Sequence, residues 1–364
     1  MKLQQYIFMF LIIFSITSCS RFTISNRYYG NNTANKKFNV DIEVNKLYKN
    51  LAIDEVNFEI SNINSQSNEL QKIYQDYPSN YEFIKNLNAR IINVLDNIGF
   101  NEEIEYNFAQ KSKNNNILFT KRSELGDINT KTLLITTTYF NSNNEFNPKN
   151  ISMIFEMLRL FENFNKKYHL SVLFINNSSS ISNTINTSID DVLVHLDLLS
   201  IIDLQFEDTL NKVNVLNLNN ESKISTFIND SINYNSFNFI NFSEIIDKTQ
   251  FNNISNNKID FVRIVSETNT IYINKCATFL ISIIADILNK PNIPSVSTND
   301  LMFRVVLDLY NHNSIKKILY KINNGEYSEL TKQSILEVDD YINLKIKLVD
   351  LFDNQSDELS LKLF

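Results

Sequence analysis

Few side chains in this sequence are of the types that hold metal ions or transfer protons, because its 364 residues include only three histidines and two cysteines. His195 and Asp197 are two residues apart in the segment DVLVHLDL, which we predict to be a strand. Residues two apart on a strand point to the same face, so this pair could share a metal ion. A histidine packed at the margin of the sheet is the more ordinary interpretation of the same pattern.

Motifs for nucleophilic and phosphate chemistry are absent from the sequence. Ser178, Ser179 and Ser180 are consecutive, but no Gly-x-Ser-x-Gly elbow accompanies them. The whole chain has four glycines, which leaves little scope for a loop that wraps a phosphate. The aromatic stretch from Tyr234 to Phe242 could line a surface for a glycan or a peptide, although core packing is the simpler explanation.

The N-terminal residues have the features of an export signal. Lys2 precedes an apolar run from Tyr6 to Ile16, which is too short for an ordinary transmembrane helix but has the length of a signal-peptide core. Residues 16–19 read Ile-Thr-Ser-Cys and resemble the cleavage site of bacterial lipoprotein signal peptides. That resemblance implies a signal peptide over residues 1–18 and a mature chain that begins at Cys19.

In such lipoproteins the cysteine carries a diacylglycerol anchor and an amide-linked acyl chain such as palmitate. Two or more acyl chains suffice for stable anchoring. We therefore expect lipidation at Cys19 and a location in the bacterial cell envelope, at the outer membrane if the host has one. A plain secretory signal and a retained anchor helix are the alternatives. With Cys19 lipidated, Cys276 is the only thiol left, so no internal disulfide is expected.

Composition narrows the class of protein. A hydrophobic content of 43% and an aromatic content of 12% can build a folded core. The formal net charge of −7 argues against a nucleic-acid partner, which requires a basic face. The mature chain is longer than one typical domain, so we expect two.

Hydrophobic periodicity predicts a polar tether over residues 19–45 and an α/β domain over residues 46–295. After two helices that lie on either side of Pro78, short strands and helices alternate, which is typical of a mostly parallel sheet covered by helices. The expected strands are 104–108, 116–120, 132–140, 170–175, 191–198, 213–218 and 259–265, and the expected later helices are 149–166, 223–233 and 274–288.

From residue 298 to residue 364 the pattern changes to alternating strands that are separated by the turns NHNS, NNGE and DNQS. This spacing predicts a small all-β sandwich. The segment ILYKINNGEYSEL resembles bacterial immunoglobulin-like modules, in which an aromatic strand runs into such a turn.

Residues 79 to about 290 resemble the M28 family of zinc aminopeptidases. The segment VLDNIGF matches a helix that ends in Leu-Gly-aromatic, and TLLITTTYFNS, KNISMIFEMLRLFENF, LSVLFINNS and DVLVHLDLLS follow in the order of the family's metal-binding strands and helix. The resemblance implies an α/β/α sandwich around a mixed, mostly parallel sheet, as in zinc exopeptidases.

The residues at the family's site positions differ from the family's ligands. A pair of zinc ions is held by histidine and carboxylate groups, with a glutamate as the general base. The corresponding positions here are Tyr139, Asn141, Lys149, Asn176, Asn177 and Asp197, of which only the last keeps a ligand's identity. The stretch 267–274, where the final histidine is expected, contains none. The resemblance therefore predicts no catalytic residue, no zinc and no other cofactor.

These observations favour a membrane-anchored lipoprotein with a catalytically inactive aminopeptidase-like domain that acts by binding or scaffolding. Its expected partners are the membrane, through the lipid, and a peptide or protein ligand in the cleft of the α/β domain. Two alternatives stay open. One is a divergent metal-dependent hydrolase with an unrecognised site, and the other is a surface adhesin or structural lipoprotein.

Overall fold

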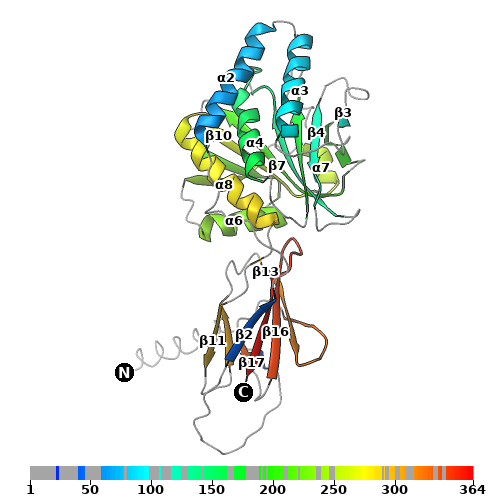
Figure 1. Ribbon diagram of the computed structural model, residues 1–364, viewed down its shortest axis with the longest axis vertical. Coiled ribbons are helices and arrows are strands. Elements are labelled where there is room, and N and C mark those ends of the chain that lie inside the picture. The colour runs from blue at the N-terminus through cyan, green and yellow to red at the C-terminus, as the bar shows by residue number, and fades with distance from the viewer. Residues whose placement is uncertain are drawn as a thin grey trace, which may run out of the picture. The chain divides into compact units, whose positions relative to one another are not determined.

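The structure of the chain is a computed structural model, drawn as a ribbon in Figure 1. It describes residues 22–23, 40–45, 59–77, 80–97, 106–107, 116–123, 130–141, 143–161, 168–177, 188–189, 192–193, 196–207, 212–219, 222–234, 239–245, 251–288, 291, 295–299, 304–308, 315–330, 335–337 and 342–363. The predicted signal peptide, the lipidation site Cys19, the candidate ligand His195 and the serines 178–180 lie outside these residues.

The chain divides into two compact units. One comprises Lys49–Asn289 and is called the α/β unit below. The other combines Met1–Tyr48 with Lys290–Phe364. We call it the all-β unit, because all of its described elements are strands.

An eight-stranded sheet forms the centre of the α/β unit, in the order β3-β4-β6-β5-β7-β10-β8-β9. Four of its seven neighbouring pairs are parallel: β5 with β6, β5 with β7, β7 with β10 and β8 with β9. The strands are β3 (Tyr106–Asn107), β4 (Ile117–Lys121), β5 (Thr132–Thr138), β6 (His169–Ile175), β7 (Leu198–Glu207), β8 (Val213–Asn217), β9 (Ile240–Glu244) and β10 (Phe261–Glu267). The predicted fold class, an α/β domain around a mixed and mostly parallel sheet, is confirmed.

One face of this sheet is covered by helices (Figure 1). They are α2 (Ile60–Asp76), α3 (Asn80–Asn97), α4 (Pro148–Leu160) and α8 (Thr270–Leu288), and α6 (Lys223–Tyr234) contacts β10. Helix α4 lies against β5 and β7 and is buried along most of its length, which agrees with its many apolar residues. Small residues allow α2 to approach it, with Ser67 Oγ donating to Ser152 Oγ at 3.0 Å.

The opposite face carries a separate apolar layer, which we call the core cluster. It joins side chains of the central strands to the short helix α7 (Asn252–Asn256). Its buried members are Leu118, Leu134, Leu173, Ile175, Ile189, Val192, Leu196, Ile201, Leu218, Phe251, Ile254 and Phe261. Apolar layers on both faces explain why the central strands consist of nearly continuous hydrophobic residues.

The strand predicted over residues 191–198 is wrong. Residues 188–189 and 192–193 are helical instead, and the amide of Leu196 donates to the carbonyl of Val192 at 2.9 Å. The apolar residues follow a spacing of three, four and seven from Ile189, which places them on one face of a helical segment and into the core cluster. The strand begins only at Leu198, as β7.

The all-β unit contains two sheets. The first has five antiparallel strands in the order β14-β13-β16-β17-β2, and the second has four strands in the order β1-β15-β12-β11. The strands are β1 (Phe22–Thr23), β2 (Val40–Asn45), β11 (Ser295–Asn299), β12 (Arg304–Asp308), β13 (Ile315–Ile322), β14 (Ser328–Leu330), β15 (Ile335–Glu337), β16 (Ile342–Asp350) and β17 (Glu358–Leu363).

Part of the predicted tether over residues 19–45 is therefore a structural element. Strand β2 pairs with the C-terminal strand β17 along its whole length, from Glu358 with Asn45 to Leu363 with Val40. The sequence VDIEVN alternates apolar and polar residues, which suits a strand at the edge of a sheet. Both ends of the chain thus contribute strands to the same sheet.

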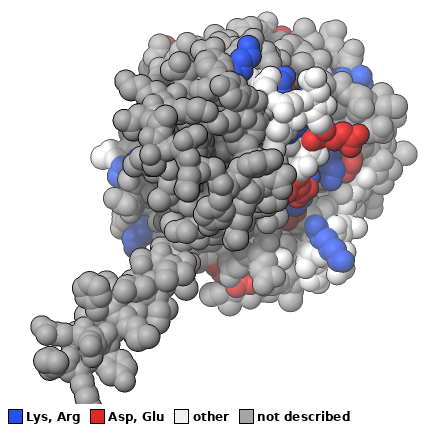
Figure 2. Space-filling view, turned by 90° about the horizontal axis from the view of Figure 1, so that it is seen from below, with Lys and Arg blue, Asp and Glu red and all other residues white. Residues whose placement is uncertain are grey.

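Charged residues are interspersed on the described part of the surface. In the view of Figure 2, acidic and basic side chains lie next to one another and no extended basic patch is visible among the described residues. Several of them form ion pairs, such as Lys317 with Glu329 at 2.9 Å. Among the described residues, no helix combines the length and the apolar character needed to cross a membrane.

Candidate functional site

The carboxyl ends of parallel strands β5, β6, β7 and β10 meet at one edge of the central sheet. In open α/β sheets this edge is where ligands bind. The strand ends are aligned, since Thr138 lies opposite Ile175 and Glu207 lies opposite Glu267. We call this edge, with the residues that follow each strand, the carboxyl edge.

Tyr139 follows β5, at the position where the resemblance places a histidine ligand. Its side chain is fully buried, and its hydroxyl donates to Asn88 Oδ1 of α3 at 2.9 Å. Burial raises the pKa of the phenol above its usual value, so the group stays neutral. Tyr139 therefore links the carboxyl edge to a helix and has the properties of a core residue.

Asn177 follows β6 and is bonded to the backbone that follows β5. Its Oδ1 accepts from the amide of Phe140 and its Nδ2 donates to the carbonyl of Phe140, both at 2.9 Å. The preceding residue, Asn176, is buried, and its amide donates to Asn116 Oδ1 at 2.9 Å. The amide group of Asn177 thus uses both of its hydrogen-bonding functions to join two strand ends.

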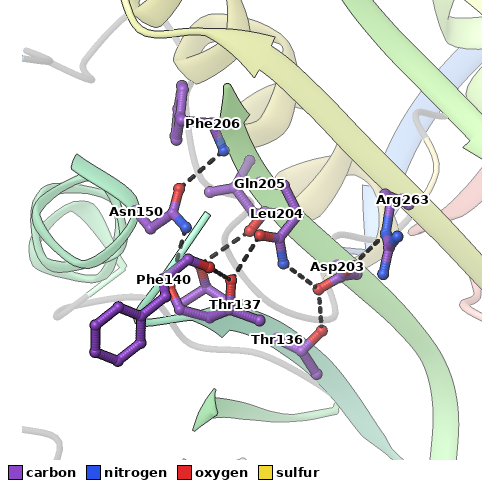
Figure 3. Close-up of polar contacts among 10 residues, drawn as sticks. Thr136, Thr137, Phe140, Asn150, Asp203, Leu204, Gln205, Phe206 and Arg263 are labelled. Carbon is purple, nitrogen blue, oxygen red and sulfur yellow. Dashed lines mark hydrogen bonds and ion pairs between the residues drawn. The ribbon is translucent and has the colours of Figure 1, made fainter. Parts of the chain in front are cut away.

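Asn150 plays the same part between β5 and β7 (Figure 3). It lies in the first turn of α4, where its Nδ2 donates to the carbonyl of Thr138 at 3.0 Å and its Oδ1 accepts from the amide of Phe206 at 2.8 Å. Nearby, Asn147 Nδ2 donates to the carbonyl of Phe206 at 2.7 Å. Sequence reasoning gave neither residue this role, because their shared partner Phe206 is more than 50 residues away in the sequence.

Lys149 and Asn141 complete the carboxyl edge. Lys149 Nζ donates to the carbonyl of Thr268, directly after β10, at 2.5 Å. Asn141 Oδ1 accepts from the amides of Asn143 and Glu145 at 3.0 and 2.9 Å and so shapes the loop before α4. Together, the side chains from 141 to 177 tie all four strand ends to one another or to α4.

Asp197 does not belong to this group. It is exposed and lies immediately before β7, whose first residue pairs with Thr132 at the start of β5. Asp197 is therefore at the amino ends of the parallel strands, at the edge opposite Tyr139 and Asn177. Our placement of this residue at a strand end followed from the mispredicted strand over residues 191–198.

A carboxylate that sequence reasoning missed lies within β7. Asp203 is fully buried and saturated with donors: Thr136 Oγ1 and Gln205 Nε2 donate to Oδ1 at 2.7 and 3.1 Å, and Arg263 Nε donates to Oδ2 at 2.6 Å (Figure 3). A single acid within the apolar run LSIIDLQF was the available signal, because a charge inside a buried strand requires a partner.

The residues at the carboxyl edge do not fit a zinc pair. Zinc requires imidazole or carboxylate ligands at about 2 Å. The described residues contain no group of three or more His, Cys, Asp and Glu side chains that could hold a metal ion. Glu267 Oε2 is buried without a hydrogen-bond partner, but one carboxylate oxygen does not form a site, and the adjacent Lys149 carries a positive charge.

Of the aromatic stretch from Tyr234 to Phe242, the structure describes only the two ends, so a surface for a glycan or a peptide stays a prediction. Tyr234 is the last residue of α6, and Phe242 is a partly buried residue of the edge strand β9. Residues 235–238 lie outside the described part of the chain.

No family model and no curated protein matches this sequence. Several solved structures are similar to it in fold. A zinc aminopeptidase from Bacillus subtilis has 11% identity over 48% of this chain and 50% of its own, with a TM-score of 0.38. This chain thus spans about half the length of that enzyme.

Two further structures are matched over nearly their whole length. A leucine aminopeptidase precursor from Bacteroides thetaiotaomicron has 10% identity, with 64% of this chain and 98% of that chain covered and a TM-score of 0.46. A glutaminyl cyclase from Porphyromonas gingivalis has 10% identity, with 65% and 99% covered and a TM-score of 0.44. Resemblances this distant concern the fold alone and carry no inference about activity.

Proposed function

We propose that this protein is a membrane-anchored lipoprotein whose α/β unit binds or scaffolds a peptide or protein partner without cleaving it. The observation that supports this proposal is the bonding at the carboxyl edge. Asn150 and Asn177 use both functions of their amide groups on backbone atoms, and Lys149 donates to another.

Converting this edge to metal chemistry would carry a large energetic cost. A zinc ion could approach these amides only if they released buried backbone groups, and each unpaired group costs about 1–3 kcal/mol. An amide is also a weak substitute for the carboxylate ligands that zinc prefers. The same bonds hold the strand ends in a fixed arrangement, and a rigid edge suits recognition of a partner.

An activity assay tests the proposal that the protein does not cleave its partner. The full chain, supplied with zinc, is assayed on aminoacyl p-nitroanilides and on a peptide with an N-terminal glutamine. We expect no rate above that of buffer with zinc. Zinc-dependent turnover that falls in Glu267→Gln, the variant that lacks the unpaired carboxylate oxygen, would contradict the proposal and favour a divergent hydrolase.

We also propose that lipid on Cys19 attaches the chain to the cell envelope. The support is the sequence of residues 6–19, since Cys19 lies outside the described residues. In cells fed a labelled fatty acid, Cys19→Ala should lose the label and leave the membrane fraction, whereas the matched variant Cys276→Ala should keep both. Label that persists in Cys19→Ala would contradict this anchor. An unlabelled, unprocessed protein that stays in membranes would indicate a retained signal helix.

For the all-β unit, we infer an immunoglobulin-like module that separates the membrane from the α/β unit. Its support is the succession of strands β13, β16 and β17 with the turns NNGE and DNQS between them. In cells that carry the anchored protein, deletion of residues 290–364, which keeps the signal sequence and Cys19, should reduce access of an antibody to the α/β unit. Unchanged access would contradict the spacer role.

A further inference from the structure

Arg263 is held in one position by contacts on two sides. Its Nε donates to the fully buried Asp203 at 2.6 Å, and its guanidinium carbon lies 4.9 Å from the centroid of the Phe251 ring. The side chain of Arg263 keeps 21% of its surface exposed, whereas that of Asp203 has none. The pair therefore joins a fully buried acid to an arginine whose side chain is partly exposed.

The guanidinium of Arg263 has two further nitrogens, Nη1 and Nη2. Among the residues that the structure describes, the Arg263 side chain hydrogen-bonds to Asp203 and lies over the Phe251 ring, and Nη1 and Nη2 have no hydrogen-bond partner there. The contact with Asp203 uses only Nε of the guanidinium, and Oδ1 of Asp203 accepts from Thr136 and Gln205. Two parallel N–H groups in a fixed plane match the two oxygens of a carboxylate.

We propose that Arg263 binds a carboxylate of a partner, with Nη1 and Nη2 donating to its two oxygens. This inference rests on the proposed function and specifies its ligand as the free carboxyl end of a peptide. The ordering cost of binding is small, since Asp203 and Phe251 already fix the guanidinium in the free protein. Gln205 and Thr138, joined by a hydrogen bond of 2.7 Å on the same sheet face, offer neutral polar groups beside it.

The acidic residues near Arg263 favour a carboxylate over a phosphate as its ligand. Glu207 and Glu267 are the last residues of β7 and β10, and each lies four residues beyond Asp203 and Arg263 on the same face of the sheet. Their negative charges oppose a dianion more strongly than a monoanion.

The test compares two peptides on the unaltered full chain. Acetyl-trialanine with a free carboxyl end and the same peptide with an amidated end are titrated while the Nε–Hε signal of Arg263 is followed by NMR. We expect saturable shifts with the acid and at least about 10-fold weaker binding of the amide, because a charge-assisted bidentate contact is lost. Equal binding of the two peptides, or no binding of the acid, would overturn the proposal.

Variants and a second anion locate the contact. Arg263→Lys keeps the charge but loses the fork, so affinity for the acid should fall about 10-fold. The matched control is Arg90→Lys, since Arg90 is paired with Glu69 on the surface of two helices, and this variant should bind as the unaltered chain does. An equal fall in both variants, or tighter binding of inorganic phosphate than of the peptide acid, would contradict a carboxylate site at Arg263.

The result of these titrations can be distinguished from the result of the turnover assay. An acetylated peptide has no free amino end for an aminopeptidase to act on, so its binding reports recognition alone. Failure here removes the carboxylate ligand and leaves the non-catalytic proposal standing. Turnover on aminoacyl substrates removes the non-catalytic proposal and leaves the carboxylate contact to be judged by these titrations.

Discussion

Two polar regions of the central sheet satisfy their buried hydrogen-bonding groups in different ways. At the carboxyl edge, Asn150 and Asn177 each use both Oδ1 and Nδ2 of the side-chain amide to hydrogen-bond backbone atoms. Within β7 and β10, the buried acid Asp203 accepts three hydrogen bonds, and its partner Arg263 has a partly exposed side chain with two nitrogens unbonded among the described residues.

The difference separates structural from binding chemistry. A side chain that is saturated inside the protein stabilises the fold but offers little to a ligand. A side chain that is fixed on one side and open on the other is ready to bind. By this criterion Asn150 and Asn177 have a structural role, and Arg263 is the side chain at which we propose recognition of a ligand.

The largest effect is expected from breaking the charged pair. Asp203→Ala leaves Arg263 partly buried without its partner, and we expect a loss of about 3–5 kcal/mol in the free energy of unfolding. Urea unfolding followed by circular dichroism measures it. A loss below about 1 kcal/mol would mean that water compensates the guanidinium and that Asp203 does not position it.

Two controls sharpen this result. Glu69→Ala breaks an exposed ion pair with Arg90 and should cost at most about 1 kcal/mol. The double variant Asp203→Leu with Arg263→Met removes both charges from the interior and should regain most of the stability lost in Asp203→Ala.

A smaller loss is expected from opening the amide network. Asn150→Ala leaves the carbonyl of Thr138 and the amide of Phe206 unpaired, which predicts a loss of about 2–3 kcal/mol. Asn150→Asp places an unpaired carboxylate oxygen against the carbonyl of Thr138 in a buried site, so its loss should be at least as large as that of Asn150→Ala. The control Asn97→Ala, on the exposed end of α3, should change stability by less than about 0.5 kcal/mol. Equal stability of Asn150→Ala and the unaltered chain would contradict the structural role.

The smallest effect is expected in the loop before α4. Asn141→Ala removes the acceptor for the amides of Asn143 and Glu145, both on exposed residues that water can satisfy. We expect a loss of about 0.5–1 kcal/mol, together with faster hydrogen exchange at the Glu145 amide. Exchange that does not change would show that the loop keeps its shape without this contact.

Much of the architecture follows from hydrophobic periodicity. Strands β5, β6 and β8 and helix α6 lie within two residues of their predicted ranges, because the strands are apolar-rich segments and the apolar residues of α6 recur at helical spacing. The strand over residues 191–198 failed for a physical reason. Its apolar residues fit both a period of two and a helical spacing, and only packing against the core cluster decides between them.

Local sequence patterns also could not predict which strands pair over a long distance in the sequence. Strand β2 is six residues long and finds its partner β17 more than 300 residues away, at the other end of the chain. At the site, residue types alone indicated which ligands are missing. The bonds that replace them, such as those of Asn150, depend on which backbone groups the fold brings within reach, and the Asp203–Arg263 pair depends on the register of β7 with β10.

Zinc content tests the central claim most directly. The full chain, purified from cells grown with ample zinc, is analysed for metal per chain beside Asp197→Ala and Asn177→Ala. We expect far less than one zinc per chain in all three, since the amides at the carboxyl edge are committed to the backbone and Asp197 lies exposed at the opposite edge. One or two zinc ions per chain, lost in Asn177→Ala, would show that the carboxyl edge holds metal and would contradict the account.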